Sequence, residues 1–356
     1  MSDREIIIDN RVIGDDREAY IVVDIGHNWA GSMSKMIDMI DTAKVNGADA
    51  VKFQTRHPRE VYSKAEFNRS SDNPQWMANT YGVHREMLEP TYLQWEQIFQ
   101  HCRDIGITAF STPFDFLSAD LLHSLDVPAF KIASGDATNI PLIEYVAAFG
   151  KPMIISTGGC EIEDVDRIVA AMEPTETPFA LLQCSCIYPA PDEVLNLRVV
   201  SQYRERYGNI CTGLSTHNYE IAPTLAAFAL GGRIFEHHYT NDRGWKGTDN
   251  HFSLTPDMLQ SLRTGLDSIH SALGDGRKRQ FLIERDYTVE RRKSLYWKRA
   301  LSEGDIAVRS DVAILCPGDG DFQPYDLDLV VGSVVITDVK AEEAVQQRDV
   351  APRIRM

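Results

Sequence analysis

Two lysines lie inside short apolar runs, where a charged side chain is unusual. Lys52 is part of Val51-Lys-Phe-Gln54, and Lys131 is part of Phe130-Lys-Ile132. An ammonium group acts as a point charge toward phosphate or carboxylate, while hydroxyl and backbone N–H groups supply directed bonds. The chain therefore has the parts of a site for a small anion. Hydroxyl-bearing segments that could complete it are Ser111-Thr112, Ser134-Gly-Asp136, Ser156-Thr-Gly-Gly159 and Ser215-Thr216.

His217 and His238 each follow a β-rich run, and imidazole is a common ligand of divalent ions. Taken singly, such a histidine is more often a hydrogen-bonded core residue, and a lone buried lysine is more often part of an ion pair. Asp24 and Gln54 also stand at or near the ends of β-rich runs. The joint occurrence of these side chains favours a shared anion and metal site.

Eight short β-rich runs alternate with longer helical runs, which is the pattern of parallel βα units. Eight such units predict a closed (β/α)₈ TIM barrel, whose active site lies at the C-terminal ends of the strands. An open doubly wound sheet is the alternative, but no GxGxxG opens a helix after the first run. The candidate strands are residues 20–24, 50–54, 107–112, 129–132, 152–156, 179–183, 210–214 and 233–236.

Between the strands, apolar residues recur at helical spacing. The polar stretch 56–89 is too long for an ordinary connection, so it is either a functional lid or a disordered insertion, and its position favours a lid. We expect the barrel domain over residues 1–280, a linker over 281–294 and a small β-rich domain over 295–356. The expected helices are 33–46, 117–125, 165–172, 221–230 and 255–273.

The composition excludes several partners. A formal net charge of −16 and a pI near 5.1 give no basic excess for nucleic acid or an anionic membrane. The charged N-terminal thirty residues do not resemble a signal peptide, and no run approaches the ~20 apolar residues of a membrane span, so we expect a cytoplasmic protein. The six cysteines, including the pair Cys184 and Cys186, are interpreted as mostly reduced thiols.

Several motifs, in the same order along the chain, resemble the sialic acid synthase (N-acetylneuraminate synthase) family, which includes legionaminic and pseudaminic acid synthases and spore-coat polysaccharide homologues. The tail, with Pro317-Gly-Asp-Gly-Asp-Phe322, is similar to the antifreeze-like (SAF) domain of that family. The motifs are Asp24-Ile-Gly-His-Asn-Trp-Ala-Gly31, Val51-Lys-Phe-Gln54, Ser111-Thr-Pro-Phe114, Phe130-Lys-Ile-Ala-Ser-Gly135, Lys151-Pro-Met-Ile-Ile-Ser-Thr-Gly158, Ile187-Tyr-Pro189, Gly213-Leu-Ser-Thr-His217 and Lys246-Gly-Thr-Asp249.

The resemblance implies condensation of phosphoenolpyruvate with an N-acylated hexosamine aldehyde, such as N-acetylmannosamine or a diacetamido hexose, with C–O cleavage and release of phosphate. It implies that His217 and His238 bind Mn²⁺ or Mg²⁺, and that the active form is a homodimer whose C-terminal domain reaches the neighbouring barrel. Catalytic roles fall to Asp24, Lys52 and Lys131. The expected substrate-binding residues are Gln54, Thr112, Ser134, Asp136, Ser156, Tyr188, Ser215 and Asp249.

The sequence departs from the family at four positions. Asp24 stands where the family usually has Glu, and Gln183 and Cys186 replace a His and an Asn. Cys316 replaces the Arg that meets the sugar's N-acyl group from the partner subunit. Loss of that fork-shaped donor predicts changed sugar recognition rather than changed chemistry.

Two other functions are compatible with these residues. A Schiff-base aldolase would use the amine of Lys52 or Lys131 as its nucleophile. A catalytically silent barrel would bind a sugar or a partner protein without turnover, which the replacements at Cys186 and Cys316 would permit.

Overall fold

The computed structural model describes residues 4–70 and 72–351. The chain divides into two compact units, Met1–Gly274 and Asp275–Met356. Each unit has its own hydrophobic core, so the two are described separately. Among the described residues, no helix is both long enough and apolar enough to cross a membrane.

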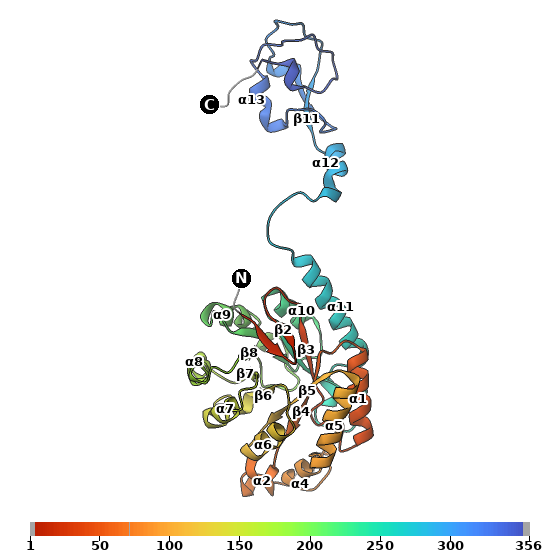
Figure 1. Ribbon diagram of the computed structural model, residues 1–356. Helices are drawn as coiled ribbons and strands as arrows, with labels where there is room; N and C mark the ends of the chain where they lie inside the picture. Colours follow the sequence, from red (N-terminus) through yellow and green to blue (C-terminus); the bar gives the residue numbers. More distant parts are fainter. Residues whose placement is uncertain (1–3, 71, 352–356) are drawn as a thin grey trace. The chain divides into compact units, whose positions relative to one another are not determined.

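Unit 1 is a closed barrel of eight parallel strands in the order β10-β3-β4-β5-β6-β7-β8-β9, surrounded by helices (Figure 1). The predicted TIM barrel is therefore confirmed, with each expected strand in place. β4 and β5 each continue one residue further than predicted, and β9 and β10 each continue two residues further, so that Thr216 and His238 still belong to the sheet. The strands are β3 (Tyr20–Asp24), β4 (Ala50–Thr55), β5 (Thr108–Pro113), β6 (Phe130–Ile132), β7 (Met153–Ser156), β8 (Phe179–Gln183), β9 (Cys211–Thr216) and β10 (Ile234–His238).

The strand sequences are largely continuous apolar runs because both faces of each strand are buried. The helices cover the outer face, and packed side chains fill the barrel interior. In β3, for example, every residue is buried. The helices begin and end at clear signals: α5 starts with a capping box between Thr91 and Gln94 and ends at Gly106, which has φ 71°. The other barrel helices are α1 (Met33–Val45), α6 (Phe116–Ser124), α7 (Ile140–Ala147), α8 (Ile162–Met172), α9 (Arg198–Arg206), α10 (Ala222–Ala229) and α11 (Pro256–Leu273).

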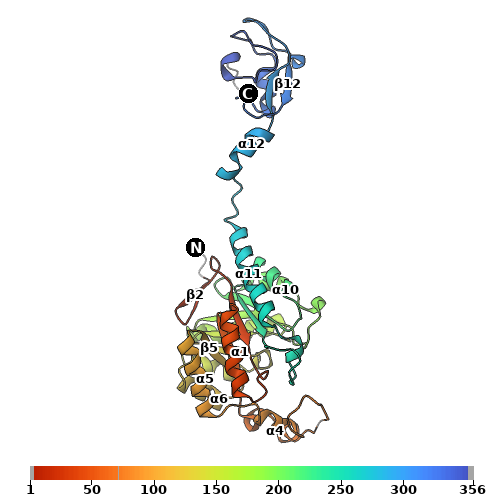
Figure 2. The same cartoon turned by 90° about the vertical axis from the view of Figure 1, so that its right-hand side faces the viewer.

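A short hairpin precedes the barrel and was not predicted. Its strands, β1 (Ile6–Ile8) and β2 (Arg11–Ile13), are joined through Asp9 and Asn10, which both have positive φ as a type I′ turn requires. Ile6, Ile8 and Ile13 are buried in the barrel core. In Figure 2 this hairpin and helix α4 (Tyr81–Glu86) lie at opposite ends of the barrel.

The long segment after β4 is folded, which contradicts the alternative of a disordered insertion. Its described residues form three short helices, α2 (Pro58–Val61), α3 (Lys64–Phe67) and α4. Phe67 packs beneath the glycine of α4, since a Cβ at Gly82 would lie 2.2 Å from the Phe67 ring. The segment therefore has packing of its own at the end of the barrel where the strands terminate.

Unit 2 pairs β11 (Ser294–Trp297) with β12 (Val312–Leu315), and α12 (Arg285–Arg291) precedes the pair. Its core is built around Trp297, with valines from the last third of the unit packed against it. Val330 ends the short helix α13 (Leu327–Val330). The predicted boundaries 1–280, 281–294 and 295–356 and the antifreeze-like character of this unit stay predictions.

Candidate active site

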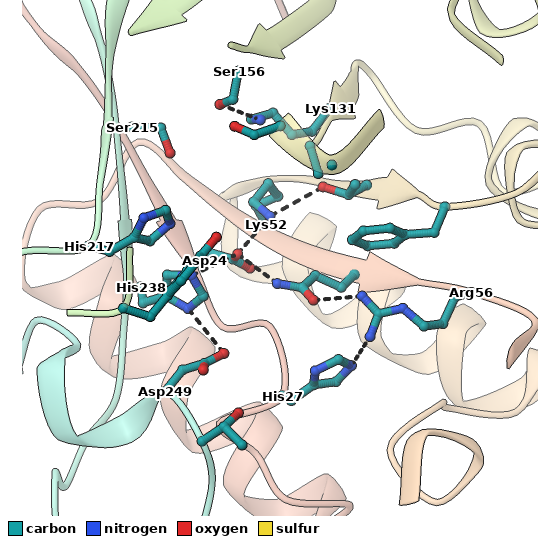
Figure 3. Close-up of a pocket in the computed structure, with 18 of the residues that line it drawn as sticks. Asp24, His27, Lys52, Arg56, Lys131, Ser156, Ser215, His217, His238 and Asp249 are labelled. Carbon is teal, nitrogen blue, oxygen red and sulfur yellow. Dashed lines mark hydrogen bonds and ion pairs between the residues drawn. The ribbon is translucent and has the colours of Figure 1, made fainter. Parts of the chain in front are cut away.

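A pocket of about 450 Å³ opens where the barrel strands end (Figure 3). Apart from Asp136, every residue predicted for the site lines this pocket. Asp136 lies in the turn after β6, where its Oδ1 accepts a hydrogen bond from Asn139 at 3.0 Å. The predicted residues that the pocket brings together are Asp24, Lys52, Gln54, Thr112, Lys131, Ser134, Ser156, Tyr188, Ser215, His217, His238 and Asp249.

Lys52 and Asp24 form a buried ion pair on adjacent strands. The Lys52 Nζ lies 2.8 Å from Asp24 Oδ2, and both side chains are 3% exposed. Burial alone would raise the pKa of Asp24, but the charge of Lys52 and the hydrogen bonds from Lys52 and Gln54 hold that pKa below its ordinary value. Gln54 Nε2 donates to the same carboxylate oxygen at 3.0 Å. Asp24 is therefore ionised and fixed in place.

Lys131 is held deeper in the pocket. Its Nζ donates to the Ser156 hydroxyl and to the Ile132 carbonyl, both at 2.7 Å. Burial lowers the pKa of Lys131, and the carboxylate of Glu236 opposes that shift. The ammonium group thus faces a hydroxyl-lined region with room for an anion.

Glu236 joins the two lysines and was not predicted as a site residue. Its carboxylate lies 3.9 Å from Lys52 Nζ and 3.8 Å from Lys131 Nζ. Ser215 donates to it at 3.4 Å. The sequence did contain a signal for Glu236, which stands two positions before His238 on one strand. Because side chains alternate between the two faces of a strand, both residues point into the barrel.

His217 and His238 converge on one wall of the pocket, with ring centroids 5.3 Å apart. The Nδ1 of His217 lies 3.0 Å from the Ser185 carbonyl, an acceptor, so it carries the proton and the lone pair belongs to Nε2. Burial lowers the pKa of His217 to about 3, so the ring is neutral. His238 Nδ1 lies 3.8 Å from Asp249 Oδ2, and the Tyr188 ring contacts His217 with centroids 4.0 Å apart and the ring planes tilted by 36°.

Two thiols lie near the hydroxyl-lined end of the pocket, with Cys184 in its lining and Cys186 beside Gly158. Ser134 Oγ accepts a hydrogen bond from Gly158 N at 2.9 Å. A Cβ at Gly158 would lie 2.6 Å from Cys186 Sγ and 2.8 Å from Ser134 Oγ, so glycine lets the backbone approach this end closely. Cys184 lines the pocket as well.

The segment that follows β4 supplies part of the opposite side of the pocket, which the sequence analysis did not resolve into residues. Arg56 and Arg85 both approach His27 there. These positions carry no strand-end signal, because they lie in irregular chain and in a short helix. The remaining lining residues from this segment are Tyr62, Trp76, Tyr81 and His84.

The chain resembles known proteins over nearly its whole length. The NeuB family model matches residues 39–278. N-acetylneuraminate-9-phosphate synthase from Homo sapiens is 31% identical over 95% of this chain and 94% of that protein. N,N'-diacetyllegionaminic acid synthase from Campylobacter jejuni is 29% identical over 93% of this chain and 100% of that protein.

A solved structure shows the same architecture. The N-acetylneuraminic acid synthetase from Leptospira borgpetersenii superposes with a TM-score of 0.72 at 28% identity, covering 81% of this chain and 95% of that chain. The resemblance drawn from the sequence motifs is confirmed by these comparisons. The chain belongs to the NeuB family, a family of synthases with which it shares both sequence and barrel.

Proposed function

We propose that this protein condenses phosphoenolpyruvate with an N-acylated hexosamine aldehyde to form a nonulosonic acid and inorganic phosphate. The observation that carries the proposal is one pocket in a NeuB-family barrel that holds two buried lysines and two histidines. The lysines suit an anionic substrate, and the carboxylates of Asp24 and Glu236 balance the two ammonium charges.

Phosphoenolpyruvate would occupy the end of the pocket around Lys131. Its Nζ, with the hydroxyls of Ser156 and Ser215, offers a charge and directed donors within one region. Ser134 and Thr112 extend this set, and Thr112 is fixed by a hydrogen bond from Lys52 at 3.2 Å. Binding there would leave the reactive methylene carbon directed toward the sugar side.

The reaction forms one C–C bond and breaks one C–O bond. C3 of phosphoenolpyruvate attacks the sugar aldehyde carbon, and the aldehyde oxygen takes up a proton to become a hydroxyl. Water adds at C2 and gives up a proton, and the adduct expels phosphate to leave a 2-keto acid. In the part of the chain described, Asp24 Oδ1 has no hydrogen-bond partner. It can therefore accept a proton, or a hydrogen bond from a sugar hydroxyl. Lys52 keeps this carboxylate ionised between turnovers.

A divalent ion, Mn²⁺ or Mg²⁺, fits beside His217 and His238. The buried His238 Nδ1 has no hydrogen-bond partner among the described residues, and the His217 ring is neutral. Within residues 4–70 and 72–351, no three His, Cys, Asp or Glu side chains are grouped to hold an ion alone, so water or substrate would complete its coordination. When bound, the ion would polarise the aldehyde as a Lewis acid.

The sugar would lie against Tyr188 and Asp249, with Gln54 below it. Tyr188 is 53% exposed although it lines the pocket, so its ring can cover a ligand. The proposal also includes a cytoplasmic homodimer, with the C-terminal domain reaching the neighbouring barrel. Sedimentation of the active enzyme as a monomer would contradict the dimer.

The test is phosphate release from phosphoenolpyruvate with Mn²⁺ and a panel of N-acylated hexosamines, with product mass recorded. Wild type should release phosphate with at least one sugar and yield a product enlarged by the pyruvyl unit. Lys131→Met should abolish release. Lys151→Met, which removes a half-buried lysine outside the pocket lining that is paired with Asp126, should not.

Two results would point elsewhere. Borohydride trapping of a pyruvate adduct without phosphate release would favour the Schiff-base aldolase. Binding of the metal and of phosphoenolpyruvate without turnover of any sugar in the panel would favour the silent barrel. His217→Ala should lose Mn²⁺ binding in equilibrium dialysis, a readout independent of turnover.

A further inference from the structure

Cys184 and Cys186 form what we call the thiol pair. They follow β8 in the stretch 184–187, which belongs to no helix or strand. Both are free thiols, and their side chains hydrogen-bond to each other. Cys184 is buried, at 6% exposure, whereas Cys186 is exposed. A small reagent from the solvent therefore reaches Cys186 first.

The surroundings of the thiol pair stabilise a thiolate at Cys186. Ser134 Oγ accepts a hydrogen bond from Gly158 N at 2.9 Å, which leaves its own proton to donate to the pair. A hydrogen bond from Cys184, with smaller effects of Ser134 and of the Lys131 charge, lowers the pKa of Cys186 to about 6. Reactive cysteines are typically found in such electropositive, partly exposed surroundings.

The other described thiols of unit 1 lack this combination. Cys102 and Cys211 are buried, and burial raises the pKa of each to about 12. Cys160 is half-buried, and burial raises its pKa to about 11. Cys186 thus combines access from solvent with a thiolate near neutral pH, and a second thiol contacts it directly. Cysteines that sense oxidants have the same three properties.

The thiol pair can close a disulfide without unfolding the barrel. Cα atoms two positions apart are separated by at most ~7 Å in an extended chain. Disulfides use Cα separations of about 4.4–6.8 Å, so a slight bend is sufficient. The stretch 184–187 lies beyond the last paired residue of β8, Gln183, so this bend leaves the strand pairing intact.

A disulfide between these thiols would enclose Ser185, which holds His217. The Ser185 carbonyl lies 3.0 Å from His217 Nδ1, and the Ser185 hydroxyl donates to the Val194 carbonyl at 2.6 Å. Joining the two flanking sulfurs bends the backbone at Ser185 and so moves the acceptor that orients the imidazole. Such an acceptor fixes which ring nitrogen is available to a ligand. Oxidation of the thiol pair would therefore disturb the histidine wall of the pocket.

We propose that the thiol pair is a modification site for hydrogen peroxide, at which Cys186 is oxidised first and Cys184 then closes a disulfide. The Cys186 sulfur attacks one peroxide oxygen, the O–O bond breaks, and the departing hydroxide takes up a proton to become water. The Cys184 sulfur then displaces hydroxide from the sulfenic acid, and the Cys184 thiol proton converts that hydroxide to water. The two thiols lose two electrons, and one peroxide is reduced to two waters. The site itself does not depend on the proposed function; only its effect on turnover does.

The first experiment treats the whole protein with hydrogen peroxide at neutral pH and maps disulfides by mass spectrometry of unreduced peptides. Wild type should contain a disulfide between Cys184 and Cys186, which dithiothreitol should reverse. Cys160→Ser is the matched control and should form the same disulfide, because it removes another thiol whose charge interacts with Cys186. A link from Cys186 to Cys160, or no disulfide in wild type, would overturn the inference.

Single variants test the order of the two steps, with dimedone present to capture sulfenic acid. Cys184→Ser lacks the second thiol, so the dimedone adduct should accumulate on Cys186. Cys186→Ser should form neither a disulfide at this site nor an adduct on Cys184 at the same peroxide concentration. An adduct that forms on Cys184 of Cys186→Ser as fast as on Cys186 of Cys184→Ser would refute the proposed order.

Phosphate release connects the modification to the proposed function. After removal of peroxide by catalase, oxidised wild type should be slower than its own untreated sample by about 10-fold or more, and dithiothreitol should restore the rate. Cys186→Ser should keep its own rate after the same treatment. If untreated wild type releases no phosphate, the proposed function fails, whereas the peptide map still decides the inference. Complete disulfide formation with unchanged turnover would refute the effect on His217.

Discussion

Lys52 and Asp24 stand side by side on β4 and β3, with the ammonium nitrogen 2.8 Å from the carboxylate oxygen and almost no solvent exposure. The pair lies in the middle of the pocket and not in the apolar core. Two ions held out of water cost desolvation free energy, which only close contact and additional hydrogen bonds offset. Gln54 and Thr112 supply those bonds.

Removal of both members of this pair should therefore cost less stability than the two single removals added together. Asp24→Asn or Lys52→Met alone should lower the free energy of unfolding by ~3–5 kcal/mol, and the double variant by less than the sum. Asp24→Asn should also lower kcat/KM by ~10²-fold or more, because its proton-accepting oxygen is lost. Urea unfolding and phosphate-release assays measure the two effects. Additive losses of stability would show that the pair is not coupled.

Gly213 in β9 allows two strands to approach each other. A Cβ at this position would lie 1.8 Å from the Ile234 carbonyl oxygen of β10, so Gly213→Ala must displace the neighbouring strand. We expect the free energy of unfolding to fall by at least the ~1–3 kcal/mol that overpacking usually costs. The yield of folded protein should also be lower. Gly208→Ala is the control, since nothing lies within 4 Å of its added Cβ. A thermal midpoint unchanged by Gly213→Ala would contradict the geometry.

The barrel was predictable because its strands are short apolar runs with chemistry-bearing residues at their ends. Lys52, Lys131 and His217 could be placed in one site without coordinates, since all barrel strands end at one rim. The ends of β9 and β10 were predicted too early because Ser215, Thr216 and His238 are polar. Polar side chains at strand ends look like loops in a sequence, although the pocket keeps them inside the sheet.

The approach of Arg56 and Arg85 to His27 was not predictable by the same reasoning. Arg56 and Arg85 lie 29 positions apart in a polar segment with no strand pattern, and only its folded helices bring both to His27. The β1–β2 hairpin was missed for a different reason. Three-residue strands are too short to show a periodic pattern of apolar residues. The signal that the sequence did offer for this hairpin was the Asp9-Asn10 turn.

His84 offers a pH-dependent test of the segment after β4. Burial, then Arg85 and Lys246, lowers the pKa of His84 from 6.5 to about 4. Its Nδ1 accepts a hydrogen bond from Met77 N at 3.1 Å, which protonation would break. Because the unfolded segment binds the proton more readily, its stability should be constant above pH 6.5 and fall as pH decreases from there toward 4.

NMR titration of the imidazole signals checks this prediction, with His84→Asn identifying the resonance. The signal of His84 should remain that of a neutral ring at pH 5. A midpoint near the ordinary value of 6.5 would show that the segment does not bury this ring in solution.

Cys186 should be the most nucleophilic thiol at this end of the pocket. A hydrogen bond from Cys184 lowers the pKa of Cys186 to about 6, whereas the pKa of Cys184 is raised well above its ordinary value. The thiolate is the species that alkylating reagents attack. Carbamidomethylation of Cys186 by iodoacetamide should therefore proceed at pH 7 and slow below a midpoint of about 6.

The variants distinguish this cause from simple exposure. Cys184→Ser still offers a donor, so it should leave the midpoint low, whereas Cys184→Ala removes the donor and should move the midpoint toward 9. Cys316, which lies in unit 2, is also an exposed thiol and serves as an internal control. Phosphoenolpyruvate bound beside Ser134 would place negative charge close to the Cys186 sulfur, so it should raise the midpoint and slow the labelling. Mass spectrometry of the labelled peptides measures both effects, and labelling unaffected by phosphoenolpyruvate would place its phosphate elsewhere in the pocket.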